Sequence, residues 1–202
     1  KKEFDINLNK ANFFAGHSLG EYSALSCAGY IKFSDTLKIL KARGEAMQNA
    51  VPRGIGGMIA ILGTNIKKIE DIISGNKGNC NFQIANDNSE GQIVVSGKLK
   101  DLDILTEILK SMNIRNIKLP VSAPFHCELM GSATKIMRDE INKIEFNEGH
   151  NILMSNVTAD TVKDIPVIKD LLIKQIENRV RWRESVVNMI NNGVENFIEI
   201  GP

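Results

Sequence analysis

The chain has 202 residues, of which 43% are hydrophobic and 24% charged, a composition typical of a globular domain and not of a disordered chain. Lys and Arg number 25 against 24 Asp and Glu, and 5% of the residues are aromatic, so we expect no nucleic-acid partner and no membrane association. Three cysteines without a C-x-x-C pair predict neither a disulfide framework nor a zinc site, and they favour a reducing compartment.

The N-terminal segment predicts a strand, a tight turn and two helices. An apolar run over 11–15 indicates a buried strand, and Gly16-His17-Ser18-Leu19-Gly20 follows it directly. The pattern over 22–29 is helical, and Ser34 or Asp35 is the expected N-cap of the next helix.

The middle of the chain, 55–119, predicts a separate ferredoxin-like subdomain with the element order βαββαβ. Its expected strands and helices cover, in order, 58–62 (strand), 66–74 (helix), 81–85 (strand), 92–96 (strand), 99–112 (helix) and 114–119 (strand).

The remaining segments, 1–54 and 120–202, predict an α/β core with a mostly parallel sheet. The expected elements after the subdomain are a helix over 129–141, a strand over 152–157, helices over 171–178 and 184–192 with Gly193 at the C′ position, and a last strand over 197–200. Because the chain opens just before its first strand and stops just after its last one, we expect this core to be truncated at both ends. Neither a signal peptide nor a membrane-spanning segment is expected.

The segment Gly16-His17-Ser18-Leu19-Gly20 fits the G-x-S-x-G nucleophile elbow. Such a turn strains the serine, and the flanking glycines allow close approach of strand and helix. It also places Ser18 at a helix N-terminus, where the Leu19 amide points at a developing oxyanion. Because the motif lies between a predicted strand and a predicted helix, we expect Ser18 to be a nucleophile in a hydrolase-like core, in preference to a merely structural turn.

A serine nucleophile needs a base, and the chain has three histidines. His17 lies on the elbow, where its ring should point elsewhere, and His150 lies in a polar loop segment. His126 ends a strand-like run before a helix, a position where α/β proteins place catalytic groups. We therefore expect His126 to be the base, with a structural histidine as the alternative.

Arg43 lies mid-helix, near the apolar side. An arginine in this place usually extends its charge to solvent. The alternative is a guanidinium that binds a substrate carboxylate through two parallel hydrogen bonds. The residues alone favour the first interpretation.

The elbow continues as Glu21-Tyr22-Ser23-Ala24-Leu25, and this whole segment closely resembles the active-site segment of malonyl-CoA:acyl carrier protein transacylases and polyketide acyltransferase domains. Further segments resemble this family in the same order: Arg43-Gly44 with Met47-Gln48, Asn86–Ser89 with Gly91–Gly97, Leu119–Cys127, Gln175 before Val180-Arg181-Trp182, and Phe197–Pro202. The resemblance covers nearly the whole chain.

The resemblance implies an acyltransferase of fatty acid biosynthesis. Ser18 would take the malonyl group from malonyl-CoA and pass it to the phosphopantetheine thiol of acyl carrier protein, with His126 as general base and then general acid. The main-chain carbonyl of Gln175 would orient His126. Arg43 would bind the malonyl carboxylate, and the Leu19 amide would donate to the oxyanion.

The resemblance also implies substrate-binding roles for Phe125, the residue associated with malonyl selectivity, and for Asn86 and Asn88 of the asparagine loop. No pair of His, Cys or acidic residues shows ligand spacing, so we expect no metal, and we expect no tightly bound cofactor, malonyl-CoA being a substrate. The family's Gly-Gln-Gly segment, which supplies a second oxyanion donor, has no counterpart in this sequence. We expect a cytoplasmic monomer, or an organellar protein if a transit peptide was removed.

Two other functions share some of these features. A serine hydrolase or thioesterase would use the same elbow, but it has no use for Arg43. An inactive carrier-protein docking fragment would use the basic cluster Arg179, Arg181 and Arg183, for which a solvated charged loop is the alternative.

Overall fold

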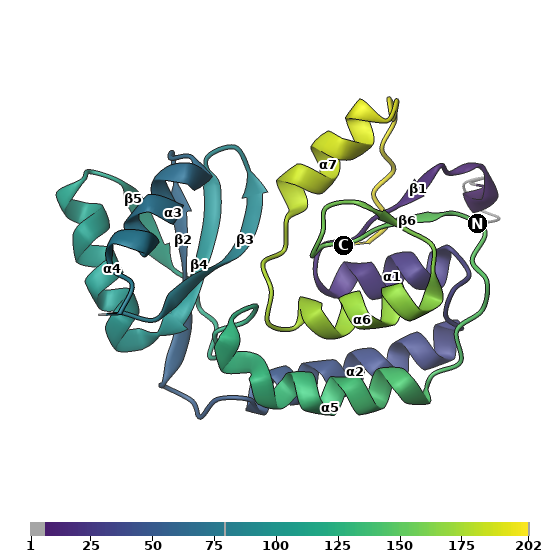
Figure 1. The fold of residues 1–202 in the computed structure, drawn as a ribbon, viewed down its shortest axis with the longest axis horizontal. Helices are drawn as coiled ribbons and strands as arrows, with labels where there is room; N and C mark the ends of the chain where they lie inside the picture. The colour runs from purple at the N-terminus through teal and green to yellow at the C-terminus, as the bar shows by residue number, and fades with distance from the viewer. Residues whose placement is uncertain (1–6, 79, 202) are drawn as a thin grey trace.

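A computed structural model describes residues 7–78 and 80–201, and its strands form two separate sheets (Figure 1). The three-stranded sheet has the order β1-β6-β7, and the four-stranded sheet has the order β3-β4-β2-β5. The strands are β1 (Phe13–Phe14), β2 (Gly56–Leu62), β3 (Phe82–Ser89), β4 (Gln92–Lys98), β5 (Arg115–Lys118), β6 (Ile152–Met154) and β7 (Thr161–Val162).

The larger part of the molecule surrounds the three-stranded sheet. Its helices are α1 (Leu19–Cys27), α2 (Phe33–Asn49), α5 (Gly131–Lys143), α6 (Ile165–Gln175) and α7 (Trp182–Asn191), with short 3-10 turns η1 (Leu8–Lys10) and η2 (Glu128–Met130). The long helices α2 and α5 pack side by side (Figure 1). On α2 the buried residues recur at helical spacing, among them Ile39, Arg43 and Met47, so one stripe of the helix faces the core.

The smaller part consists of the four-stranded antiparallel sheet with α3 (Ile66–Gly75) and α4 (Leu99–Ser111). Alternate residues of β2 point to opposite faces. Ile59 and Ile61 join the core formed with both helices, whereas Met58 and Ala60 join a small cluster that includes the half-buried Phe125. Phe125 also packs against the core of the larger part, so it lies where the two parts meet.

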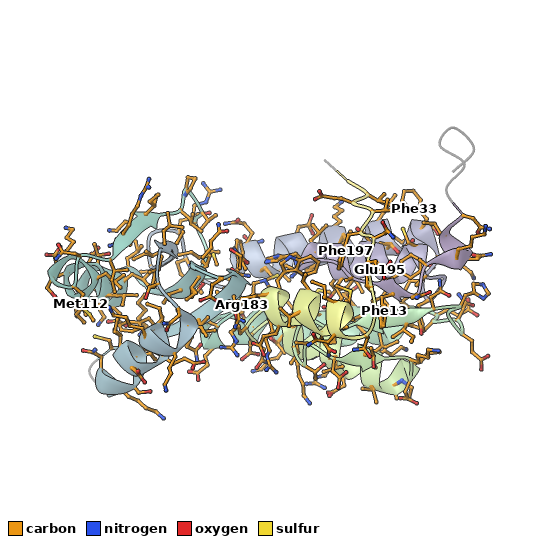
Figure 2. All side chains as sticks on the ribbon, turned by 90° about the horizontal axis from the view of Figure 1, so that it is seen from above. Phe13, Phe33, Met112, Arg183, Glu195 and Phe197 are labelled. Atoms are coloured by element: carbon orange, nitrogen blue, oxygen red, sulfur yellow. The ribbon has the colours of Figure 1, made fainter. Side chains whose placement is uncertain are left out.

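A short extended segment after α6 also joins the two parts. The Val180 amide donates to the Ala85 carbonyl (2.8 Å), and the Asp87 amide donates to the Val180 carbonyl (2.9 Å) at the edge of β3. The next residue, Arg181, donates its amide to the Asn156 carbonyl after β6 (2.9 Å). Figure 2 shows Arg183 at this junction and Met112 at the far end of the smaller part.

The predicted order β-α-β-β-α-β over the smaller part is the observed one. The three-stranded sheet differs from the prediction, because β1 and β6 are parallel but β6 and β7 are antiparallel. The prediction of a mostly parallel sheet is therefore wrong for the described residues. The reason is the short connection over 155–160, which is a turn and can only return the chain in the antiparallel direction.

Three other predicted features need correction or confirmation. The last predicted strand, 197–200, is wrong: the segment pairs with no strand among residues 7–78 and 80–201, and its apolar side chains are exposed. The N-cap of α2 is Lys32, so Ser34 and Asp35 lie inside the helix. Gly193 follows the C-cap of α7 with φ of +85°, which confirms its predicted C′ position.

Candidate active site

The turn between β1 and α1 holds Ser18 in a strained conformation, with φ of 54° and ψ of −104°. The strain predicted for the elbow serine is therefore present. The two glycines differ in their importance. A Cβ on Gly16 would lie 2.0 Å from the Gly20 carbonyl oxygen, whereas a Cβ on Gly20 would meet nothing within 4 Å. Only Gly16 is required by the close approach, which corrects the expectation for Gly20.

Ser18 and His126 are hydrogen-bonded partners. The Ser18 Oγ lies 2.7 Å from His126 Nε2, and His126 Nδ1 lies 2.8 Å from the main-chain carbonyl oxygen of Gln175. Because a carbonyl only accepts, Nδ1 donates the proton to Gln175 and Nε2 is left to accept the hydroxyl proton. His126 is buried and has a left-handed backbone conformation, with φ of 59°.

The electrostatic surroundings keep His126 neutral. Burial, and then the positive charge of Arg43, lower the pKa of His126 to about 3. The hydrogen bond to the Gln175 carbonyl opposes this shift but is weaker. At neutral pH the imidazole is therefore in the form that accepts a proton from Ser18.

Arg43 points into the site and not toward solvent, so the solvent-facing interpretation is wrong. Its side chain is buried, and Nη2 lies 2.9 Å from Ser18 Oγ and 2.9 Å from Gln175 Oε1. The guanidinium carbon lies 5.6 Å from the centre of the Tyr22 ring. Within residues 7–78 and 80–201, Nε has no hydrogen-bond partner. Arg43 thus offers free guanidinium donors beside the serine.

Two buried polar residues that the sequence reasoning missed hold the elbow. Asn156 Oδ1 accepts a hydrogen bond from the Ser18 amide (2.7 Å), and Asn156 Nδ2 donates to the Gly16 carbonyl (2.8 Å). The Glu21 carboxylate accepts from Gln175 Nε2 (2.6 Å). The signal for Asn156 was its place in a predicted strand of an α/β sheet. The signal for Glu21 was an acidic residue at the start of a predicted helix.

The other predicted site residues lie around this centre. Leu19 is the first residue of α1, where amides lack partners within the helix, and its side chain is exposed. Asn88 Oδ1 accepts from His17 Nε2 (2.8 Å), so the His17 ring does point away from Ser18. Asn86 is buried on β3, and the Phe125 carbonyl accepts from the Ser96 hydroxyl (2.6 Å).

Comparison with known proteins places the chain in a family. The family profile described as "Acyl transferase domain" matches residues 9–202. The chain belongs to the acyl transferase domain family. This confirms the resemblance that the elbow and the later segments predict.

The named relatives of this acyl transferase domain all carry the name of a malonyl transacylase. It is 42% identical over 195 residues to a malonyl CoA-acyl carrier protein transacylase of Bacillus subtilis, covering 95% of this chain and 61% of the relative. A solved structure of the transacylase of the same name from Clostridium perfringens superposes with a TM-score of 0.93 at 42% identity, covering 100% of this chain and 63% of that one. A second solved structure is of a malonyl-transacylase in complex with a type II PKS acyl-carrier protein, with a TM-score of 0.89 at 33% identity, covering 96% of this chain and 62% of that one.

The basic cluster of the acyl transferase domain is not a free cationic surface. Arg179 pairs with Glu70 (3.0 Å) and Glu184 (3.3 Å), Arg181 pairs with Glu184, and Arg183 pairs with the buried Asp87 (2.8 Å). Each arginine thus has an acidic partner, which removes the basis for a carrier-docking patch at this point. His150 is exposed in a loop, as expected.

The described part of the acyl transferase domain, residues 7–78 and 80–201, contains no group of three or more His, Cys, Asp or Glu placed to hold a metal ion. In the same ranges, none of the helices combines the length and the apolarity needed to cross a bilayer.

Proposed function

We propose that this chain carries the chemical centre of a malonyl-CoA:acyl carrier protein transacylase, which transfers the malonyl group through a malonyl-serine intermediate for fatty acid biosynthesis. The chain spans 61% of the Bacillus subtilis relative. The activity, the substrate and the partner are therefore proposals for this chain and are not transferred from that relative. The observation that carries the proposal is the buried Arg43, with free donors, beside a serine–histidine pair.

In the first half-reaction, Ser18 Oγ attacks the thioester carbonyl of malonyl-CoA while His126 Nε2 takes the hydroxyl proton. The Leu19 amide donates to the oxyanion of the tetrahedral intermediate. When the intermediate collapses, the carbon–sulfur bond breaks, and the CoA sulfur takes the proton from His126. The product is a malonyl ester on Ser18.

In the second half-reaction the phosphopantetheine thiol of acyl carrier protein gives its proton to His126 and attacks the ester carbonyl. The Ser18 Oγ leaves and recovers the proton. A neutral carbonyl, that of Gln175, orients the imidazole in place of a carboxylate, which leaves the imidazole less basic. That suits a thiol leaving group, which needs little help from an acid.

Substrate selection is proposed to rest on Arg43, with Phe125, Asn86 and Asn88 as further substrate-binding residues. A malonyl carboxylate would accept two hydrogen bonds from the guanidinium and neutralise it. An uncharged acyl group would leave that charge buried and unpaired, which is unfavourable by about 3–5 kcal/mol.

The alternatives receive less support. A serine hydrolase or thioesterase shares the elbow, but it needs neither an arginine aimed at the serine nor a carbonyl in place of the usual acid. A docking fragment would need a free basic cluster, whereas Arg179, Arg181 and Arg183 are paired with acids.

We also infer a division into a hydrolase-like core, 1–54 and 120–202, and a ferredoxin-like subdomain, 55–119. The element order β-α-β-β-α-β and the sheet order β3-β4-β2-β5 support the second, and the parallel β1–β6 pair before the elbow supports the first. The cytoplasmic location and the monomeric state stay predictions.

The function is tested by intact-mass analysis after the chain is mixed with malonyl-CoA. We expect a malonyl adduct on the wild type and on Ser23→Ala, which changes an exposed serine of α1, and none on Ser18→Ala. The adduct should move to a pantetheine thiol much faster than to water. Equal loss to water without a thiol would favour the hydrolase, and absence of any adduct would contradict the proposal.

A further inference from the structure

Glu21 is a buried carboxylate with no catalytic part in the mechanism above. Its side chain is 1% exposed, and one oxygen, Oε2, accepts hydrogen bonds from Gln175 Nε2 (2.6 Å) and from the Asn156 amide (3.4 Å). Among residues 7–78 and 80–201, Glu21 forms no ion pair within 4.0 Å. Burial raises the pKa of the Glu21 carboxyl to about 7, and a buried acid in the first turn after the elbow calls for a reason.

The Gln175 side chain links Glu21 to the reacting centre. Its Nε2 donates to Glu21 Oε2 and to the Ser18 carbonyl (3.0 Å), and its Oε1 accepts from Arg43 Nη2 (2.9 Å). An amide has one accepting and one donating end. With the donating end held by Glu21, the accepting end must face Arg43. If the amide were reversed, two donors would meet at Arg43 and two acceptors at Glu21.

The arrangement also keeps the Arg43 donors free. A direct Glu21–Arg43 ion pair would fill the guanidinium fork and exclude a substrate carboxylate. With the Gln175 amide between them, Glu21 is linked to Arg43 through hydrogen bonds and does not fill the guanidinium fork. The main-chain carbonyl that faces His126 belongs to the same residue but does not depend on which way the side-chain amide points.

We propose that Glu21 is a positioning residue, whose carboxylate oxygen fixes the orientation of the Gln175 amide and through it the Arg43 guanidinium. The inference rests on the proposed function, because it assigns Glu21 to recognition of the acyl carboxylate and not to the Ser18–His126 pair. Loss of the acceptor at residue 21 should therefore slow the reaction with a carboxylate-bearing acyl group and spare the reaction with a neutral one.

The test compares two variants of similar size. Glu21→Leu removes the acceptor, whereas Glu21→Gln keeps an oxygen that can accept from Gln175. Two rates are measured on the full chain: malonylation of Ser18 by malonyl-CoA, and labelling of Ser18 by a neutral alkyl fluorophosphonate. For Glu21→Leu we expect malonylation to fall about tenfold, the effect of one hydrogen bond to a charged group, while labelling stays within about twofold. For Glu21→Gln both rates should stay within about threefold of wild type.

Two further variants guard the interpretation. Glu21→Met also removes the carboxylate and has a flexible side chain of similar length, so it should show the same selective loss and serves if Glu21→Leu does not fold. Asp101→Asn changes a buried acid of α4, which accepts from the Asn81 amide (3.1 Å) in the smaller part, and should leave both rates unchanged.

The outcomes separate the inference from the proposed function. Equal loss of both rates in Glu21→Leu, or similar behaviour of the Leu and Gln variants, overturns the positioning role alone. A wild-type chain that reacts with the fluorophosphonate but is never malonylated overturns the proposed function and this inference together.

Discussion

The buried imidazole of His126 determines how the nucleophile responds to pH. Burial and the charge of Arg43 lower its pKa to about 3, so the protonated fraction is small throughout the range from pH 5 to pH 8. Labelling of Ser18 by a neutral fluorophosphonate should therefore show no loss as the pH falls from 8 to 5, and should decline only below about pH 4. Rates measured across pH 3.5–8 check this. An inflection near pH 6.5, the ordinary value for histidine, would contradict it.

The residues of the candidate site were predictable from sequence to different degrees. Ser18 and His126 follow from the elbow and from elimination among three histidines. Arg43 does not follow from its neighbours, since a mid-helix arginine usually reaches solvent, and only the resemblance indicated its direction. Asn156 and Glu21 escaped because a hydrogen bond between residues far apart in sequence leaves no local pattern.

At the scale of elements, the junction of β1 with α1 offers a matched pair of glycines. A Cβ on Gly16 would lie 2.0 Å from the Gly20 carbonyl oxygen and 2.7 Å from the Glu21 amide nitrogen, both backbone atoms that cannot move away cheaply. Gly16→Ala should lower the free energy of unfolding by more than about 2 kcal/mol. Gly20→Ala has open space on a helix and should raise it by about 0.5–1 kcal/mol. Denaturant titrations of both variants check the pair, and equal effects would contradict it.

The helices and the strands of the smaller part were predictable because each has its own periodic pattern. Strands β2 and β4 are apolar runs, and both are central in the four-stranded sheet. The errors fall where pairing decides the structure. Residues 197–200 have the composition of a strand but pair with none in the part of the chain that the structure describes, and β7 exists only because a turn returns it against β6. Composition does not specify such pairing.

At the scale of the molecule, the two parts are joined at Phe125 and at the segment around Val180, and charge pairing reinforces the second junction. Arg183 of α7 donates from Nε and Nη2 to both carboxylate oxygens of Asp87 on β3 (3.1, 3.1 and 2.8 Å). Asp87 is buried, with 1% of its side chain exposed, whereas Arg183 is partly exposed. The proposed substrate-binding Asn86 and Asn88 flank Asp87 on β3, so the same pair fixes this strand relative to the elbow.

Removal of Arg183 should therefore loosen the junction. Arg183→Ala leaves the Asp87 carboxylate buried without its ion partner, and we expect the free energy of unfolding to fall by about 2 kcal/mol, less than for a fully buried pair because Arg183 is partly in solvent. Amide hydrogen exchange at Val180 and Asp87, whose amides donate across the junction, should accelerate more than exchange in the core of either part.

Two comparisons make this prediction specific. Arg115→Ala, which changes an exposed arginine of β5, should alter the free energy of unfolding by less than about 0.5 kcal/mol. Adding Asp87→Asn to Arg183→Ala should recover part of the loss, because the stranded charge is then absent. If the double variant were no more stable than Arg183→Ala, contacts of the arginine stem, and not its pairing with Asp87, would account for the loss of stability.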